Sequence, residues 1–340
     1  MEDAFSQANG GPTFKILPAV RKQIPGLFGF WGISDSGKTY TALRFARGLV
    51  GPKGKIVLAD TENERAKLYA GKFGGWEHLD FQPPFSPERY RAAMDDAIRA
   101  NAAVLIVDSG SHVWEGEGGV LDMADNARTS SGKPMEGLLK WNRPKMSFKR
   151  MANAMLRAPI PIIFCLRAKD KNIQVGKGKD AQIVNVGEVP ICESRFIYEM
   201  TISVHLEVGT HFPIAPVKAP EDIADIIRPG EFVTEEMGAK IAAWLAGGVA
   251  LDQDKERLYR EARDIATLGT ARLKQHWETL KPEDKRKLKP LLEDLKSVAA
   301  HADAEAAAQE NLPLGQEPDV GFLEDKPILP VPEDETNKMA

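Results

Sequence analysis

Cysteine is scarce in this chain of 340 residues, which contains only Cys165 and Cys192. Two cysteines cannot make the disulfide framework of a small secreted domain, and they fit a reducing, cytoplasmic compartment. The six histidines are scattered without the spacing of metal ligands, so a zinc site is not expected. No apolar run approaches the roughly 18 residues that a membrane-spanning helix needs. The opening residues, MEDAFSQANGG, lack the basic and apolar regions of a signal peptide, so we expect a cytoplasmic protein without a membrane partner.

Net charge is also small, at −4 for the whole chain, but it is unevenly distributed. Residues 128–179 contain 13 Lys or Arg and two acids, a local net charge of +11. Residues 301–340 contain ten acids and two lysines, a net charge of −8. A basic block attracts a phosphate backbone, whereas an acidic segment with few large apolar side chains buries too little surface to fold. We therefore predict a nucleic-acid surface in the first segment and disorder in the second.

The most specific motif is GISDSGKT at residues 32–39, which has the G-x-x-x-x-G-K-T pattern of a phosphate-binding loop. Glycines let the backbone approach a phosphate and point its N–H groups at it. Lys38 is expected to reach the β- and γ-phosphates, and the Thr39 hydroxyl to ligate Mg²⁺. A strand is predicted before the motif and a helix after it, so a helix N-terminus would lie beneath the phosphates. We expect ATP and Mg²⁺ to be bound by Gly32, Ile33, Ser34, Asp35, Ser36, Gly37, Lys38, Thr39 and Tyr40.

Short apolar runs alternate with helical patterns through most of the chain. The runs KIVLAD at 55–60, AVLIVD at 103–108 and PIPIIFCL at 159–166 are of the kind buried in parallel sheets. Strands that alternate with helices around a phosphate loop predict an α/β P-loop NTPase fold with a mostly parallel central sheet. The expected domains are an N-terminal extension at 1–25, the ATPase domain at 26–248, a small helical module at 249–300 that could dock a partner protein, and a disordered acidic tail at 301–340.

Several segments have less regular patterns, and each carries a local expectation. These are a short strand at 14–17, helical character at 65–73, a helix at 138–157 interrupted by Pro144, a flexible loop at 169–190, and one or two joined strands at 196–208.

Two acids follow predicted strands at the edge where an ATPase needs them. Asp108 ends the run at 103–108, where a P-loop ATPase places the acid that holds Mg²⁺. The alternative is a carboxylate that only caps the strand. Glu62 follows the run at 55–60 and would face the nucleotide from the carboxyl edge of the sheet. It is a candidate to orient or deprotonate the attacking water, although a solvated acidic loop fits the spacing equally well.

The order GISDSGKT, KIVLADTENERAKLYAGKFG and AVLIVDS resembles the RecA family of recombinases over roughly residues 26–170. The resemblance implies a RecA-like fold in which Glu62 is the catalytic glutamate and Asp108 the Mg²⁺-associated acid. Arg167-Ala-Lys169 and Tyr198–Thr201 are further similar to phage and prophage RecA-like ATPases linked to single-strand annealing and recombination. RecA itself has a γ-phosphate-sensing glutamine where this chain has Arg167, which could instead act as a charge-stabilising finger.

The basic block contains two candidate DNA-binding segments. The first, LKWNRPKMSFKRM, interleaves aromatic residues with cations, which suits single strands without sequence preference. The second follows the third predicted strand, and in the RecA resemblance the DNA loops follow the second and third strands. A basic solvated helix face with Trp141 in the core is the alternative for the first segment. The candidate DNA-binding residues are Lys140, Trp141, Arg143, Lys145, Lys149, Arg150, Lys169, Lys171, Lys177 and Lys179.

Three functions are compatible with these features. The first is an ATPase that acts on single-stranded DNA in recombination, annealing or repair, as a homo-oligomeric filament or ring with nucleotide at subunit boundaries. The second is a P-loop phosphotransferase, although no arginine-rich lid is evident and the basic block would have no role. The third is a non-catalytic loader in which ATP only switches contacts with a partner protein. The first hypothesis assigns catalytic roles to Glu62, Lys38 and Arg167.

Overall fold

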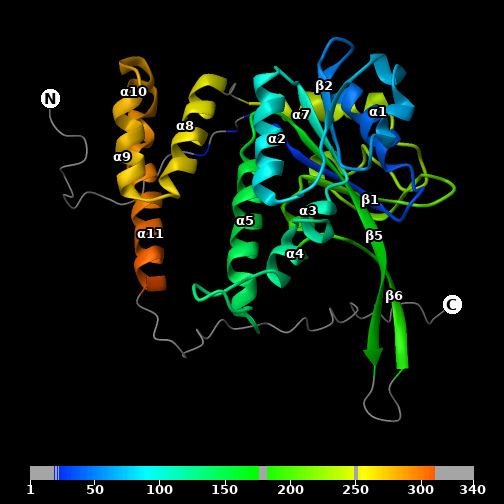
Figure 1. Ribbon diagram of the computed structural model, residues 1–340. Helices are drawn as coiled ribbons and strands as arrows, with labels where there is room; N and C mark the ends of the chain where they lie inside the picture. Colours follow the sequence, from blue (N-terminus) through cyan, green and yellow to red (C-terminus); the bar gives the residue numbers. More distant parts are fainter. Residues whose placement is uncertain (1–18, 20, 22, 176–181, 249–251, 311–340) are drawn as a thin grey trace, which may run out of the picture. The chain divides into compact units, whose positions relative to one another are not determined.

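The computed structural model describes residues 19, 21, 23–175, 182–248 and 252–310. The chain divides into two compact units, Gln7–Glu261 and a second that includes Ala262–Ala340. In the described part of the first unit, strands form a mostly parallel sheet in the order β3-β2-β4-β5-β1-β7-β8, and β6 pairs with β5 (Figure 1). The strands are β1 Leu27–Gly32, β2 Ile56–Asp60, β3 Glu77–Asp80, β4 Val104–Asp108, β5 Ile162–Val175, β6 Gln182–Pro190, β7 Ile202–Leu206 and β8 Pro213–Lys218.

Helices connect these strands and cover the sheet. The helices of the first unit are α1 Lys38–Val50, α2 Pro87–Arg99, α3 His112–Glu115, α4 Val120–Asp125, α5 Asn142–Leu156, α6 Phe196–Glu199 and α7 Glu235–Leu245, with α8 Gln253–Ala266 crossing the division between the units. Among the strands of the described residues, only β6 and β8 run antiparallel to their neighbours. The mixed α/β architecture with a mostly parallel sheet therefore agrees with the prediction from strand and helix alternation.

The apolar side chains of the central strands contribute to two separate hydrophobic cores, one on each face of the sheet. In β4, Leu105 and Val107 pack with α2 and α5 on one face of the sheet. Val104 and Ile106 pack with α1 and α7 on the other face. Successive strand residues point to opposite faces, so a strand covered on both sides must be apolar at every position. This is why β4 is a run of four buried aliphatic residues followed by an acid.

Two glycines allow α1 and α7 to approach closely. A Cβ at Gly48 would lie 2.0 Å from the Glu235 carbonyl oxygen, and one at Gly238 would lie 2.5 Å from the Phe45 carbonyl oxygen. Both distances are far below a permitted contact, so the two helices can come this close only because both positions are glycine. The contact fixes α1, and with it the phosphate loop, against the sheet.

The strand order brings three carboxyl ends together. β5 lies between β1 and β4, with Gly32 in register with Arg167 and Asp108 in register with Cys165. β2 is the other neighbour of β4, and Asp60 is in register with Asp108. Parallel strands end at the same edge of a sheet, so the phosphate loop, Asp108, Arg167 and the residues after Asp60 converge there.

The segment at 169–190 was predicted to be a flexible loop, and this prediction is wrong. β5 continues to Val175 and pairs with the antiparallel β6, so the two strands project as a ribbon beyond the rest of the sheet (Figure 1). Residues 176–181, which include Lys177 and Lys179, lie outside the described residues. A ribbon exposed to solvent needs no apolar face, so its polar composition resembled a loop. The β-branched residues of β6 were the available strand signal.

Other local predictions need correction. Residues 196–208 form the short helix α6 before β7, rather than strand throughout. Pro144 does not interrupt a helix, because α5 begins at Asn142 and the first turn of a helix needs no proline N–H donor. The helical segment at 65–73 is two short 3₁₀ turns, and the predicted strand at 14–17 lies outside the described residues. β8 was not predicted because it contains prolines, which an edge strand tolerates.

The second unit contains helices, as predicted for residues 251–300. They are α9 Thr270–Thr279, α10 Pro282–Leu288 and α11 Leu292–Glu310. Residues 301–310 are therefore helical rather than disordered, because the alanine-rich sequence after His301 has high helix propensity. The remainder of the predicted tail, 311–340, lies outside the described residues. Across the residues that are described, no helix has both the length and the apolar composition needed to cross a membrane.

Candidate nucleotide site

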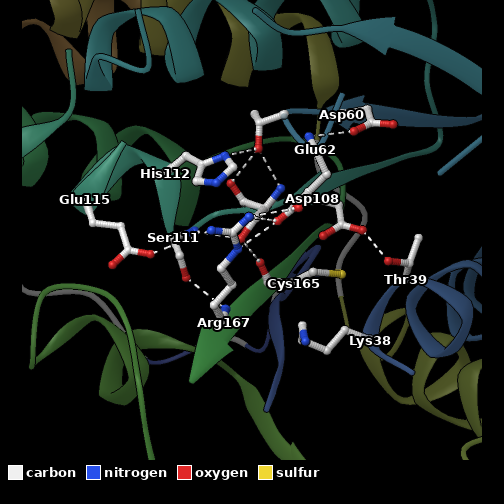
Figure 2. Close-up of polar contacts among 12 residues, drawn as sticks. Lys38, Thr39, Asp60, Glu62, Asp108, Ser111, His112, Glu115, Cys165 and Arg167 are labelled. Carbon is white, nitrogen blue, oxygen red and sulfur yellow. Dashed lines mark hydrogen bonds and ion pairs between the residues drawn. The ribbon is translucent and has the colours of Figure 1, made fainter. Parts of the chain in front are cut away.

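A pocket of about 510 Å³ opens at the carboxyl edge where β1, β2 and β4 end and where β5 passes at Arg167. It is bordered by phosphate-loop residues, by Glu62 and Asp108, and by Arg167 (Figure 2). These residues come from segments separated by up to about 130 positions, yet one cavity brings them together. The full lining is Ser34, Asp35, Gly37, Lys38, Thr39, Glu62, Arg65, Leu68, Tyr69, Asp108, Glu115, Arg167, Ala168 and Ile191.

The phosphate loop leaves β1 and enters α1 through a left-handed turn. Gly37 has a φ of 79°, and α1 begins at the next residue. A side chain at Gly37 would also meet the His211 ring, 3.0 Å from the position of its Cβ, so both the backbone angle and the space require glycine. The first N–H groups of α1 therefore face the loop, as a phosphate cradle requires.

Lys38 bonds across the loop to its backbone. Its Nζ donates to the carbonyl oxygens of Gly32 at 3.0 Å and Ile33 at 2.7 Å. Burial lowers the pKa of the Lys38 amine, and the nearby Asp108 and Glu62 carboxylates oppose this. The cation is therefore held at the rim of the loop with neutral partners.

Thr39 and Asp108, the two residues predicted to hold Mg²⁺, are in contact. The Thr39 hydroxyl donates to Asp108 Oδ2 (Figure 2). Burial raises the pKa of Asp108 to about 6, although the hydrogen bond from Thr39 opposes the shift. A carboxylate with this pKa is mostly ionised at neutral pH, and a cation beside it would favour the ionised form further.

Glu62 is positioned by Asp60, which the sequence analysis did not include in the site. Asp60 is buried at the end of β2, and its two oxygens accept the backbone N–H groups of Glu62 at 2.7 Å and Ala66 at 3.1 Å. His78 Nε2 lies 3.3 Å from Asp60 Oδ2. The turn after β2 is thus tied to a buried side chain, and Glu62 is directed into the pocket instead of lying in a solvated loop.

Glu62 and Arg167 form a two-point ion pair. Arg167 Nε and Nη2 donate to the two Glu62 oxygens, each at 2.9 Å (Figure 2). Burial would raise the pKa of Glu62, but the hydrogen bonds and charge of Arg167 outweigh it and lower the pKa. The same pair raises the pKa of Arg167. The predicted base and the predicted finger are therefore bonded to each other.

Two neighbouring groups complete this network. The Ser111 hydroxyl accepts the backbone N–H of Arg167 at 2.8 Å, and Arg167 Nη1 lies 4.0 Å from Glu115 Oε1. His112 Nδ1 lies 2.7 Å from Thr61 Oγ1, next to Glu62. Burial and the charge of Arg167 lower the pKa of His112, so its ring stays neutral at neutral pH.

Some pocket residues were missed from sequence. Glu115 belongs to the Gly- and Ser-rich segment after β4, which was interpreted as loop, and no local pattern distinguishes it from other exposed acids. Leu68 and Tyr69 border the pocket mouth, and Leu68 is 81% exposed. The sequence offered one signal for them, a leucine next to an aromatic residue soon after Glu62. Their approach to the phosphate loop depends on the 3₁₀ turn Arg65–Tyr69.

The candidate DNA-binding residues that the structure describes are not among those lining this pocket. Arg143, Lys149 and Arg150 are exposed on α5, as are Lys169 and Lys171 on the β5 ribbon. Trp141 is partly buried against the core, and the amines of Lys140 and Lys145 lie 5.5 and 5.7 Å from its ring centroid. Lys140 also pairs with Asp125 at 2.8 Å. The core alternative for Trp141 is therefore partly correct, while the exposed cations remain available to a polyanion.

Comparisons with known proteins add little to this geometry. No family model matches the chain, and no curated protein matches it. Among solved structures, the chain is similar to the ATP synthase subunit NeqB from Nanoarcheaum equitans, with 13% sequence identity over 85% of this chain and 72% of that chain, and a TM-score of 0.32. A TM-score of this size does not establish a common fold, so the functional assignment depends on the site itself.

Proposed function

We propose that the protein binds ATP with Mg²⁺ in the pocket at the carboxyl edge of the sheet and hydrolyses it. One observation carries this proposal. Lys38, Thr39, Glu62 and Asp108 come from three separate motifs, and all of them border one cavity. A chance glycine-rich turn would have no reason to face two acids from neighbouring strands.

The residues present fit a magnesium ion. Mg²⁺ prefers oxygen ligands, and the Thr39 hydroxyl and Asp108 carboxylate are already in contact. The Asp108 carboxylate is also buried, and a cation beside it would offset the cost of burying its negative charge. Thr39 and Asp108 would hold the ion, which would neutralise charge on the β- and γ-phosphates.

The chain's own residues supply the remaining functions. The backbone N–H groups at the start of α1 bind the phosphates, and Lys38 adds a positive charge to the β- and γ-phosphate oxygens. Glu62 orients the attacking water and accepts its proton, since Asp60 fixes its backbone and directs its side chain to the pocket. Arg167 stabilises negative charge that develops on the transferred phosphoryl group.

We further propose that the protein is a RecA-like ATPase that acts on single-stranded DNA as a homo-oligomer in phage-type recombination, annealing or repair. The placement of basic residues supports a polyanionic partner. Lys169 and Lys171 follow Arg167 by two and four residues on the same strand, and both are exposed. Cations on a ribbon that begins at the pocket would connect bound single-stranded DNA directly to the ATP site.

ATP turnover measured with and without single-stranded DNA tests both parts. We expect Mg²⁺-dependent turnover that rises severalfold when DNA is added. Turnover stimulated instead by a small-molecule acceptor would favour a phosphotransferase. Binding without turnover under either condition would contradict the proposed hydrolysis and favour an ATP-switched loader.

A further inference from the structure

We propose that Glu115 is a second acceptor for Arg167, to which the guanidinium moves from Glu62 when the γ-phosphate of ATP enters the pocket, so that Glu62 is freed for catalysis. The inference rests on the proposed ATPase function and adds a positioning residue to the same site. It follows from a conflict between two roles, from the position of a second acid, and from the way the backbones are anchored.

The conflict is that the two groups expected to act on ATP are bonded to each other. Both Glu62 oxygens accept from Arg167, with a further Nη2–Oε1 distance of 2.8 Å. A carboxylate that activates water must present an oxygen to it. A guanidinium that stabilises phosphate charge must present N–H donors to that charge. While the pair stays intact, both Glu62 oxygens and two Arg167 nitrogens are engaged, so the pair competes with both roles.

Glu115 offers the arginine another partner on the same side of the pocket. Its Oε1 lies 4.0 Å from Arg167 Nη1, which is beyond hydrogen-bond length but within reach of a side-chain rotation. Nε and Nη2 bond Glu62, whereas Nη1 is the Arg167 nitrogen that lies near the second acid. The side chains of Arg167 and Glu115 are 41% and 32% exposed, against 18% for Glu62, so the two that must move have room to do so.

The backbones on either side are fixed, so the exchange needs no change in fold. The Arg167 N–H is held by Ser111 Oγ at 2.8 Å, and Ser111 directly precedes α3, which ends at Glu115. Asp60 holds the Glu62 N–H at 2.7 Å on the other side. Arg167 therefore pivots on a main chain anchored to the same segment as its second acceptor.

The γ-phosphate supplies the driving force. It adds negative charge beside Lys38, and this charge attracts the guanidinium away from Glu62. Glu115 then accepts a hydrogen bond from the guanidinium in place of the Glu62 oxygen that is released. Binding of ATP, but not of ADP, should therefore depend on both acids, and with opposite signs.

The test measures the affinity of a fluorescent, non-hydrolysable ATP analogue with Mg²⁺, and of the matching ADP compound. Glu115→Gln should weaken binding of the ATP analogue about three- to tenfold and leave ADP binding unchanged. Simple electrostatics predicts the reverse, because removing a negative charge near an anion site tightens anion binding. Glu117→Gln, an exposed acid in the same loop, is the matched control and should not weaken binding.

A second arm uses Glu62→Gln, which should tighten binding of the ATP analogue severalfold because no ion pair must be broken. In an Arg167→Gln background both effects should vanish. If circular dichroism shows that the Arg167→Gln variant is unfolded, Arg167→Lys replaces it as the background. Glu115→Gln that binds the analogue as tightly as wild type, or more tightly, overturns the exchange. So does tightening by Glu62→Gln that persists without Arg167. Failure of the wild-type protein to bind the analogue refutes the proposed function itself, which is a distinct result.

Discussion

The two halves of β5 differ in nearly every physical respect. Residues Ile162–Leu166 are fully buried, and this half pairs with β1 on one side and β4 on the other. From Ala168 onward the strand pairs only with β6, and Lys169 to Asn172 are exposed. Arg167 is the junction, half-exposed and bonded to Glu62. Close packing determines the sequence of the first half, whereas the second half can change its side chains at little cost to the fold.

The same contrast applies to charge. In the pocket, Lys38, Glu62 and Asp108 each have hydrogen-bond partners at fixed positions, in surroundings that shift the pKa of all three. On α5 and the ribbon, exposed cations face solvent, where salt screens interactions beyond about 10 Å at 0.1 M. Substitutions in the pocket should therefore act largely independently of salt, and those on the basic surfaces should act through it.

The largest expected effect is at Lys38. Lys38→Ala should abolish ATP binding and hydrolysis, because it removes the cation aimed at the β- and γ-phosphates. The fold should survive, since the lost bonds go to the carbonyl oxygens of Gly32 and Ile33, within six residues of Lys38 in the same loop. Lys53→Ala, an exposed lysine just beyond α1, is the control. Isothermal titration with ATP·Mg²⁺ and a turnover assay measure the effect, and near-normal turnover in the variant would place the site elsewhere.

The halves of β5 and its partner strand can be compared directly by stability. Phe164 is 0% exposed and packs edge-on against Phe196, whereas Ile183 on β6 is 79% exposed. Phe164→Ala should lower the free energy of unfolding by about 3–5 kcal/mol through loss of buried surface and a cavity. Ile183→Ala should change it by less than about 0.5 kcal/mol. Chemical denaturation measures both, and a large loss at Ile183 would show that the ribbon is part of the folded core.

Glu62→Gln tests whether the pocket residue Glu62 acts in hydrolysis. We expect turnover at least ~100-fold slower, the usual scale for losing a general base. ATP·Mg²⁺ should still bind, because Glu62 is not among the phosphate-loop donors. Single-turnover hydrolysis measures the step, with Glu64→Gln as a control from the same turn. Equal rates for Glu62→Gln and wild type would reduce the Glu62–Arg167 pair to a structural ion pair.

The phosphate loop and Asp108 could be located from sequence because each is a local feature of the chain. The phosphate loop is one continuous motif, and Asp108 directly ends a run of buried strand residues. The convergence of these parts follows from a general property of parallel sheets, whose carboxyl ends share an edge. The Glu62–Arg167 bond could not be predicted, because the two residues are 105 positions apart and meet only because of the strand order.

The ribbon and the start of the tail were predicted incorrectly for a shared reason. Where their side chains are described, neither segment contains a buried apolar residue, and this was interpreted as absence of structure. Cross-strand hydrogen bonds hold β5 and β6 together without a core, and intrinsic helix propensity carries α11 through residues 301–310. Secondary structure can persist where tertiary packing is thin.

For the exposed cations of α5 and the ribbon, we expect substitutions to weaken DNA binding in a salt-dependent way. Replacing Lys145, Lys149 and Arg150 by Ala should weaken binding of single-stranded DNA and reduce the slope of log affinity against log salt by about two. Replacing Lys169 and Lys171 should have a similar but smaller effect. Fluorescence anisotropy with a labelled oligonucleotide at several salt concentrations measures it. A weaker affinity with an unchanged slope would mean that these cations do not contact phosphates.

The smallest expected effect concerns residues 311–340, which contain seven acids and two lysines. A tethered segment of net charge −5 can compete with DNA for a basic surface when screening is weak. A chain ending at Glu310 keeps α11 whole, so it should fold normally and bind single-stranded DNA about two- to threefold more tightly at low salt. The difference should disappear as the Debye length falls below ~5 Å. A matched chain with its seven acids in 311–340 changed to Asn or Gln separates charge from length and should behave like the truncated protein. Equal affinity of all three proteins at low salt would exclude competition for the basic surface, and would leave the Pro-Ile-Leu-Pro-Val-Pro stretch at 327–332 as the feature to test for protein docking.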